Sequence, residues 1–289
     1  EFLWACGNRT YRMLEQDLDE RKPLPDALHH RMMARYNEYL AVGGMPQAVE
    51  SFVKGGSYQE IDRIKRGIIG LYIDDFYKID PTGSLGMYFR SIPSELSRQS
   101  MRFRIKGKAM KTEIRRISEM ADSQTVQRSM HVNDPCVGLP MTQDPEFFKL
   151  FLEDTGLFVT LCFYDREFSD NTIYGSLVRG RLPANLGYVY ENAVAQGLKA
   201  AGYGLFYHTF PKNDPKHKYE IDFVIPSGKK VCPIEVKSSS VSCHASLDAF
   251  IEKHGNDVHR GVVISGKNLR EEDGIVYLPI YMTGLIDRL

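Results

Sequence analysis

The last hundred residues alternate between helix-like and strand-like segments, and this alternation constrains the fold more than any other feature of the chain. The helix-like segments carry apolar residues three or four positions apart, and the strand-like ones are short runs rich in Val, Ile, Phe and Tyr. The predicted segments are helix 186–201, strands 205–210, 219–225 and 231–237, helix 245–254, and strands 261–265 and 275–278. This order predicts an α/β or α+β domain at 184–289 with a central mixed sheet.

Residues 1–83 are predicted to form a helical region. A stripe of apolar side chains follows Asp26, a typical N-cap residue, and stops at Gly43-Gly44. Pro46 suits the first turn of a short helix, and Ser57 suits the N-cap of a long amphipathic helix.

Residues 84–155 combine helical pieces with two strand-like runs, Thr125–Val132 and Phe147–Leu152. Helices followed by a β-hairpin are typical of a winged-helix module, which either contacts DNA or mediates only domain packing. Residues 156–183 are expected to be a linker. The whole chain is therefore predicted to be a multidomain α+β protein.

Charge is balanced over the chain but not along it. Lys and Arg number 37, as do Asp and Glu, yet Arg90 to Arg128 contains ten basic and four acidic residues, a net charge of +6. Asp134 to Asp170 contains eight acidic and two basic residues, a net charge of −6. Either the first block binds phosphates, or the second folds against it. The candidate nucleic-acid contacts are Arg98, Arg102, Arg104, Lys106, Lys108, Lys111, Arg115 and Arg116.

Strands 219–225 and 231–237 are joined by a Gly-containing turn and predict an antiparallel hairpin. If the turn centres between Gly228 and Lys229, then Asp222 lies opposite Glu235, and Glu220 lies opposite Lys237. The period of two places these four side chains on one face and the apolar Ile221, Phe223, Ile225, Ile234 and Val236 on the other. The charged patch is either a surface ion-pair ladder or a site for a hard cation such as Mg²⁺.

Asp222 followed by Glu235-Val236-Lys237 resembles the D…(D/E)xK motif of the restriction-endonuclease-like PD-(D/E)xK nucleases. The resemblance implies that Asp222 and Glu235 bind Mg²⁺ or Mn²⁺, with the Val236 carbonyl as a further ligand. It implies that Lys237 acts on the attacking water or on the developing charge. Glu191, on the preceding helix, is the matching fourth member of the site; the alternative is an ordinary exposed helix residue.

A second resemblance covers most of the chain. The segments Tyr39–Pro46, Phe148–Leu157, Tyr190–Asn192, Glu220–Phe223 and Pro233–Ser238 are similar to ordered elements of bacterial and archaeal AAA-type ATPases that carry the domain of unknown function 4143. In such proteins an ATPase module precedes this region, which agrees with the absence of an initiator Met. The resemblance implies a fragment that follows the ATPase module of the same polypeptide.

Several sequence features narrow the function. No GxxxxGK[ST] loop and no GxGxxG motif occur, so no nucleotide is expected in this fragment. Five scattered cysteines without a CxxC pair fit the cytoplasm, and the longest apolar stretch is too short to cross a membrane. The expected function is Mg²⁺-dependent (or Mn²⁺-dependent) cleavage of DNA. The alternative is a non-catalytic DNA-binding, regulatory or protein-interaction module for the ATPase.

Overall fold

The computed structural model describes residues 1–8, 10–98, 100–105, 110–136, 138–165, 172–180, 187–212, 214, 217–238 and 244–289, without the side chains of residues 110, 111, 172 and 173. The N-terminal region is helical, as predicted. Its helices are α1 (Phe2–Ala5), α2 (Tyr11–Asp19), α3 (Asp26–Val42), α4 (Pro46–Val53) and α5 (Tyr58–Ile79). The Ser57 hydroxyl accepts a hydrogen bond from the Glu60 N–H at 3.2 Å, which confirms the predicted N-cap of α5. In the described ranges, no helix is long and apolar enough to cross a membrane.

The next region contains the predicted hairpin, but its strands belong to a larger sheet. Helices α6 (Ser84–Ser97) and α7 (Met110–Asp122) precede β1 (Val126–Val132) and β2 (Gln143–Leu152), which pair in antiparallel fashion. On its other side, β1 pairs in parallel with β3 (Phe206–Pro211), and β3 pairs with β4 (Lys218–Ile221). The sheet order is β2-β1-β3-β4, so the hairpin shares a sheet with strands from the C-terminal region.

The expected linker contains two helices, α8 (Thr155–Cys162) and α9 (Thr172–Val178). Residues 155–161 are all buried, because α8 is apolar around its whole circumference and packs inside the protein.

The C-terminal region contains the predicted mixed sheet. Its strands are β5 (Phe223–Ser227), β6 (Lys230–Lys237), β7 (Gly261–Ser265), β8 (Arg270–Glu272) and β9 (Ile275–Pro279), in the order β5-β6-β7-β9-β8. Strands β6, β7 and β9 are parallel, and the two outer strands are antiparallel to their neighbours. The helices of this region are α10 (Gly187–Ala200), α11 (Ala245–His254) and the 3₁₀ helix η4 (Ile280–Arg288).

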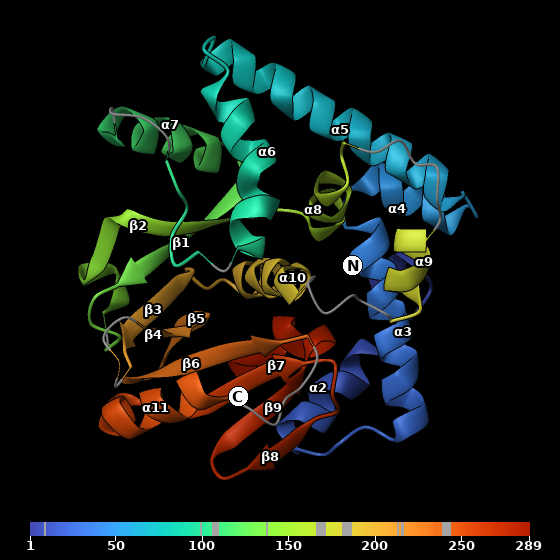
Figure 1. The fold of residues 1–289 in the computed structure, drawn as a ribbon. Coiled ribbons are helices and arrows are strands. Elements are labelled where there is room, and N and C mark those ends of the chain that lie inside the picture. Colours follow the sequence, from blue (N-terminus) through green and yellow to red (C-terminus); the bar gives the residue numbers. More distant parts are fainter. Residues whose placement is uncertain are drawn as a thin grey trace.

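Helix α10 lies at the centre of the molecule, between the two sheets (Figure 1). It packs on one face of β6, while α11 packs on the other. One buried apolar cluster includes Phe148 of the first sheet, Val194 of α10 and Ile234 of the second sheet. The two sheets and α10 therefore share one hydrophobic core.

Two of the motifs in the family resemblance meet in space. The end of α3 contacts the start of α8 at Asp154, whose carboxylate caps α8 through the Leu157 N–H at 2.7 Å and accepts the Gly44 N–H at 2.6 Å. The buried Lys65 ammonium donates to the carbonyls of Ala41, at 2.6 Å, and Gly156, at 3.2 Å. These hydrogen bonds join α3, α5 and α8, because each satisfies a buried polar group from another element.

Candidate active site

The β5–β6 hairpin has the predicted register. Phe223 lies opposite Ile234, and Ser227 lies opposite Lys230 across the turn at Gly228. Gly228 has a φ of 61°, a left-handed conformation that glycine adopts without strain. Period-two alternation and the turn therefore predicted the pairing of these two strands correctly.

The chain bends at Asp222, one residue before this ladder begins. Strand β4 ends at Ile221 and pairs with β3, so Glu220 lies opposite Thr209 in the first sheet. The prediction that Glu220 lies opposite Lys237 is therefore wrong. The bend also turns Ile221 into a different apolar cluster from that of Phe223. The Asp222 carboxylate accepts the Val236 N–H of β6 at 2.8 Å, which holds the bend against the hairpin.

The bend brings Asp222 to charged side chains from three elements. The Lys149 cluster, as we name it, consists of Lys149 of β2, Glu191 of α10, Glu220 of β4 and Asp222. Lys149 forms an ion pair with Glu220, and its Nζ lies 3.9 Å from Glu191 Oε2. Lys149 is 5% exposed, whereas about a fifth of each of the Glu191 and Glu220 side chains is exposed. The cluster is therefore closed on the Lys149 side and reaches solvent on the carboxylate side.

The carboxylates of this cluster are crowded. Burial, together with the Glu191 carboxylate, raises the pKa of Asp222 well above its usual value. Burial also raises the pKa of Glu191, although Lys149 opposes the shift. Burial lowers the pKa of Lys149, but Glu220, Glu191 and Asp222 outweigh this effect and hold it above its usual value. Because three carboxylates surround one ammonium, full ionisation leaves two negative charges without a partner in the cluster.

Glu235 and Lys237 form a separate pair. The Lys237 Nζ lies 2.5 Å from Glu235 Oε1. Glu235 shares its level in the sheet with Val263, which packs against Leu247 of α11, so Glu235 lies on the face that α11 covers. Val236 points to the opposite, α10-covered face, where it packs against the main core. The structure thus brings Glu191 and Asp222 together and pairs Glu235 with Lys237.

Carboxylate oxygens are the donors that Mg²⁺ and Mn²⁺ prefer. Glu191 and Asp222 fit such an ion chemically, because a divalent cation would stabilise two carboxylates whose pKa values are raised by burial and by neighbouring carboxylates. Among the residues whose coordinates are described, no group of three or more His, Cys, Asp or Glu side chains is arranged to hold a metal. A metal at Glu191 and Asp222 would therefore complete its shell with water or substrate oxygens.

Four arginines of the basic block form ion pairs with its own acids and with Asp80. Arg98 and Arg104 both pair with Glu95, at 3.2 and 2.9 Å. Arg116 pairs with Glu113 at 2.7 Å and with Asp80 at 3.5 Å, and Arg115 lies 3.9 Å from Glu119. The guanidinium of Arg102 lies over the Phe147 ring. Lys106, Lys108 and the side chain of Lys111 lie outside the described residues.

These pairs still leave positive charge at the surface. The side chains of Arg98, Arg104 and Arg115 are 59%, 51% and 75% exposed. Glu119 is exposed as well, so a phosphate could replace it as the partner of Arg115 at low energetic cost. Glu95 is largely buried and keeps its pairs with Arg98 and Arg104, whose exposed faces remain open to a phosphate.

Sequence reasoning missed Lys149. It lies 71 positions from Glu220 in the chain, within a strand that is otherwise apolar from Phe148 to Leu152. A lone lysine in such a strand is itself a signal, because a buried ammonium requires a nearby counter-charge.

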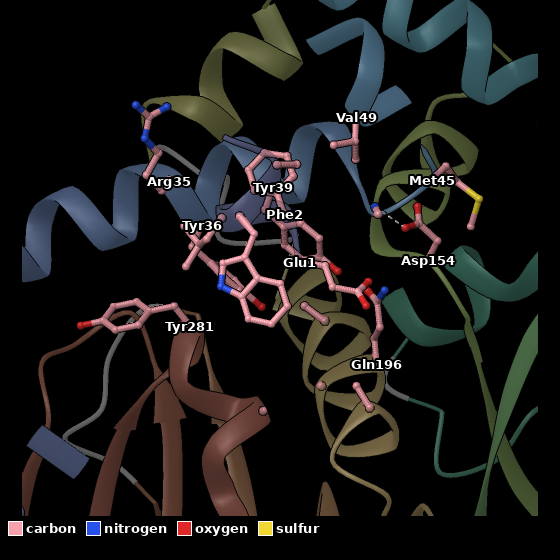
Figure 2. A pocket seen from close by; sticks show the side chains of 18 of the residues that line it. Glu1, Phe2, Arg35, Tyr36, Tyr39, Met45, Val49, Asp154, Gln196 and Tyr281 are labelled. Carbon is pink, nitrogen blue, oxygen red and sulfur yellow. Dashed lines mark hydrogen bonds between the residues drawn. The ribbon is translucent and has the colours of Figure 1, made fainter. Parts of the chain in front are cut away.

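A cavity of about 1190 Å³ opens between α1, α3, α4, α10 and η4. Figure 2 shows aromatic side chains along its wall, among them Phe2, Tyr36 and Tyr39, with Asp154 and Gln196 at one end. Its described lining contains none of the predicted site residues. We place the candidate site at the Lys149 cluster, because the cavity wall is mostly apolar and holds no comparable group of crowded charges.

Comparison with known families divides the chain into two parts. Residues 186–282 match the model of a domain of unknown function, DUF4143. A DUF4143 domain is therefore present. Residues 33–167 match a second domain of unknown function, DUF8612. No curated protein and no solved structure matches the chain.

The Lys149 cluster draws on both matched regions. Glu191, Glu220 and Asp222 lie in the DUF4143 domain, whereas Lys149 lies in the DUF8612 match. The first sheet is divided in the same way, with β1 and β2 from one match and β3 and β4 from the other. The site is therefore a property of both regions together.

Proposed function

We propose that the chain is a metal-dependent DNA phosphodiesterase whose reaction centre is the Lys149 cluster. The observation that carries the proposal is the meeting of Glu191 and Asp222, two carboxylates with raised pKa values, at the bend that precedes the hairpin. In this proposal the DUF4143 domain has a restriction-endonuclease-like fold, and residues 84–155 act as a winged-helix module. The chain follows an ATPase module in a cytoplasmic protein.

Glu191 and Asp222 would hold Mg²⁺ or Mn²⁺. The bound ion would lower the pKa of a water molecule and neutralise charge on the phosphodiester. Asp222 is positioned for this role by the Val236 N–H, which fixes one of its oxygens and leaves the other for a ligand. Lys149 holds Glu220 and Glu191 in place by charge. Lys237, 27% exposed beside Glu235, would contact the phosphate from the other side of the hairpin.

The exposed guanidinium groups of Arg98, Arg104 and Arg115 would hold the DNA backbone. Contacts to phosphates do not read sequence directly, because the phosphate backbone is the same at every base pair. The proposal therefore assigns DNA binding to residues 84–155 and the chemistry to the cluster.

Plasmid nicking tests the proposed activity. With Mg²⁺ or Mn²⁺, we expect the unaltered chain to nick the plasmid. We expect the nicking rates of Glu191→Gln and Asp222→Asn to be lower by a factor of at least about 100. Lys237→Ala should also lower the rate, whereas Lys54→Ala, at an exposed lysine of α4, should not. Equal nicking by the unaltered chain and Asp222→Asn would show that the activity comes from another source.

A second candidate function is a non-catalytic interaction module for an ATPase. It is favoured by the ion pair of Lys149 with Glu220, which already provides the cluster with a cation. This alternative predicts salt-sensitive DNA binding, or none, without nicking and without Mn²⁺ binding at millimolar concentrations.

A further inference from the structure

A row of buried polar side chains lines β1 beside the Lys149 cluster. Gln127, Ser129 and His131 alternate along the strand and therefore lie on one face of the sheet. They are 4%, 0% and 8% exposed. Ser129 lies directly opposite Lys149 in the β1–β2 ladder, where opposed Cβ atoms are about 4.5–5.5 Å apart.

The residues of this row carry polar groups that the described structure does not use. His131 Nε2 accepts the Thr209 N–H at 3.2 Å. The Ser129 hydroxyl, both polar atoms of the Gln127 amide and the Nδ1 atom of His131 have no hydrogen-bond partner within the described ranges. Buried polar groups of this kind are unusual, because each costs the free energy of its lost hydration.

The Ser129 hydroxyl oxygen and the Gln127 amide oxygen are acceptors that an ammonium could use. Lys149 presents three N–H donors on a long, flexible stem. Ser129 is its direct cross-strand neighbour, and Gln127 is the diagonal one, at a Cα separation that long side chains can bridge. A modest rotation of the stem would move the ammonium from the carboxylates towards the Ser129 and Gln127 oxygens.

A divalent cation at Glu191 would favour that rotation. The Lys149 Nζ lies 3.9 Å from Glu191 Oε2, so a metal bound by the same carboxylate would sit close to a second positive charge. Two positive charges close to one carboxylate repel each other, and the repulsion is strong where burial limits solvent screening.

We propose that Lys149 is a built-in competitor for the metal. Its ammonium pairs with the carboxylates when no metal is bound. When a divalent cation binds, the ammonium moves to a second position, where it donates hydrogen bonds to Ser129 and Gln127. This inference rests on the proposed metal function and describes the regulation of that same site. It gives Gln127 and Ser129 a role that packing alone does not provide.

Mn²⁺ affinity of the full chain, measured by calorimetry or electron paramagnetic resonance without DNA, tests the inference. Lys149→Gln removes the competitor, so we expect the Mn²⁺ affinity to rise by about tenfold. Ser129→Ala removes one acceptor from the second position of the ammonium, so Lys149 leaves the carboxylates less readily. We therefore expect the Mn²⁺ affinity to fall by about threefold while the protein stays folded. Ser91→Ala is the matched control and should leave the affinity unchanged, because the Ser91 hydroxyl donates to the Tyr88 carbonyl of its own helix.

The outcomes separate the inference from the proposed function. Tighter binding by Lys149→Gln together with weaker binding by Ser129→Ala supports competition. If Lys149→Gln binds equally or less tightly, or if Ser129→Ala has no effect, the inference is overturned, while nicking by the unaltered chain leaves the proposed function standing. Absence of Mn²⁺ binding in every protein overturns both. Ser129→Ala is a mild change and keeps the test decisive if Lys149→Gln fails to fold.

Discussion

A Cβ atom placed on Gly156 would lie 2.4 Å from the Cα atom of Gly43. The two glycines come from different elements, the end of α3 and the start of α8, and their backbones touch. Gly43 has a φ of 86°, and a Cβ there would lie 2.5 Å from Asp154 Oδ1. The segments Tyr39–Pro46 and Phe148–Leu157 thus meet in one backbone contact, and this contact requires glycine on both sides.

Gly156→Ala should destabilise the protein by about 2–4 kcal/mol, because the added methyl group meets backbone atoms that cannot rotate away. Urea denaturation followed by circular dichroism measures the free energy of unfolding. Gly67→Ala is the matched control, since nothing lies within 4 Å of its Cβ position in helix α5. That variant should be more stable by about 0.5–1 kcal/mol. Equal effects at the two glycines would contradict the contact.

The free energy of unfolding of Asp222→Asn, relative to that of the unaltered chain, should increase as the pH rises. The pKa of Asp222 is raised by burial and by Glu191, so its contribution to stability is present below the usual carboxyl pKa. The contribution is lost as the pH rises through the raised value of the folded protein, because ionisation is then easier in the unfolded chain. The asparagine can still accept the Val236 N–H but cannot ionise. Unfolding free energies of both proteins between pH 4 and pH 8 measure the effect, and a difference independent of pH would refute it.

The protein should lose stability in acid through His208. Burial lowers the pKa of His208 to about 4, and the hydrogen bond from Nδ1 to the Val132 carbonyl does not offset this effect. Stability is therefore fully present above the usual pKa of histidine and falls as the pH drops through 6.5 towards 4. His208→Asn preserves a donor near Nδ1 but removes the titration. Between pH 7 and pH 4 the unaltered chain should lose about 2–3 kcal/mol more than this variant. Parallel loss in both proteins would count against the assignment.

DNA binding, if it uses the exposed arginines, should weaken steeply with salt. Substituting Arg98, Arg104 or Arg115 by alanine should lower the slope of log affinity against log salt by about one for each phosphate contact that is lost. Fluorescence anisotropy with a short duplex at several salt concentrations gives the slope. Lys54→Ala should leave it unchanged, since Lys54 lies on α4, outside the basic block, and pairs with Glu50. An unchanged slope in the arginine variants would remove residues 84–155 from the proposed interface.

The sequence predicts local pairing well in this protein because local rules determine it. The turn at Gly228 and the alternation of apolar residues were sufficient to predict the β5–β6 register. The bend at Asp222 could not be predicted, because the apolar and polar residues alternate from Tyr219 to Phe223 as if through one strand. Tertiary structure causes the bend, because β4 pairs with β3 in the first sheet while β5 pairs with β6 in the second.

The same difference between local patterns and tertiary contacts decides which residues of the candidate site could be predicted. Glu191 and Asp222 were found as members of a motif, and they do come together. Lys149 was not found, because its partners come from regions of the sequence that no local pattern connects to it. Glu235 and Lys237 lie two residues apart on β6, so both side chains point to the α11 face and can pair there. The bend at Asp222 places Glu220 in the other sheet, away from this pair.

Strand β1 has a neighbour on each side, β2 from its own hairpin and β3 from the DUF4143 domain. A fragment trimmed to residues 186–282 would leave the β1-facing edge of β3 without a partner, open to strands of other molecules. It would also carry Glu191, Glu220 and Asp222 without the ammonium that balances them. A piece of this chain that keeps both the first sheet and the Lys149 cluster complete is therefore larger than the DUF4143 match.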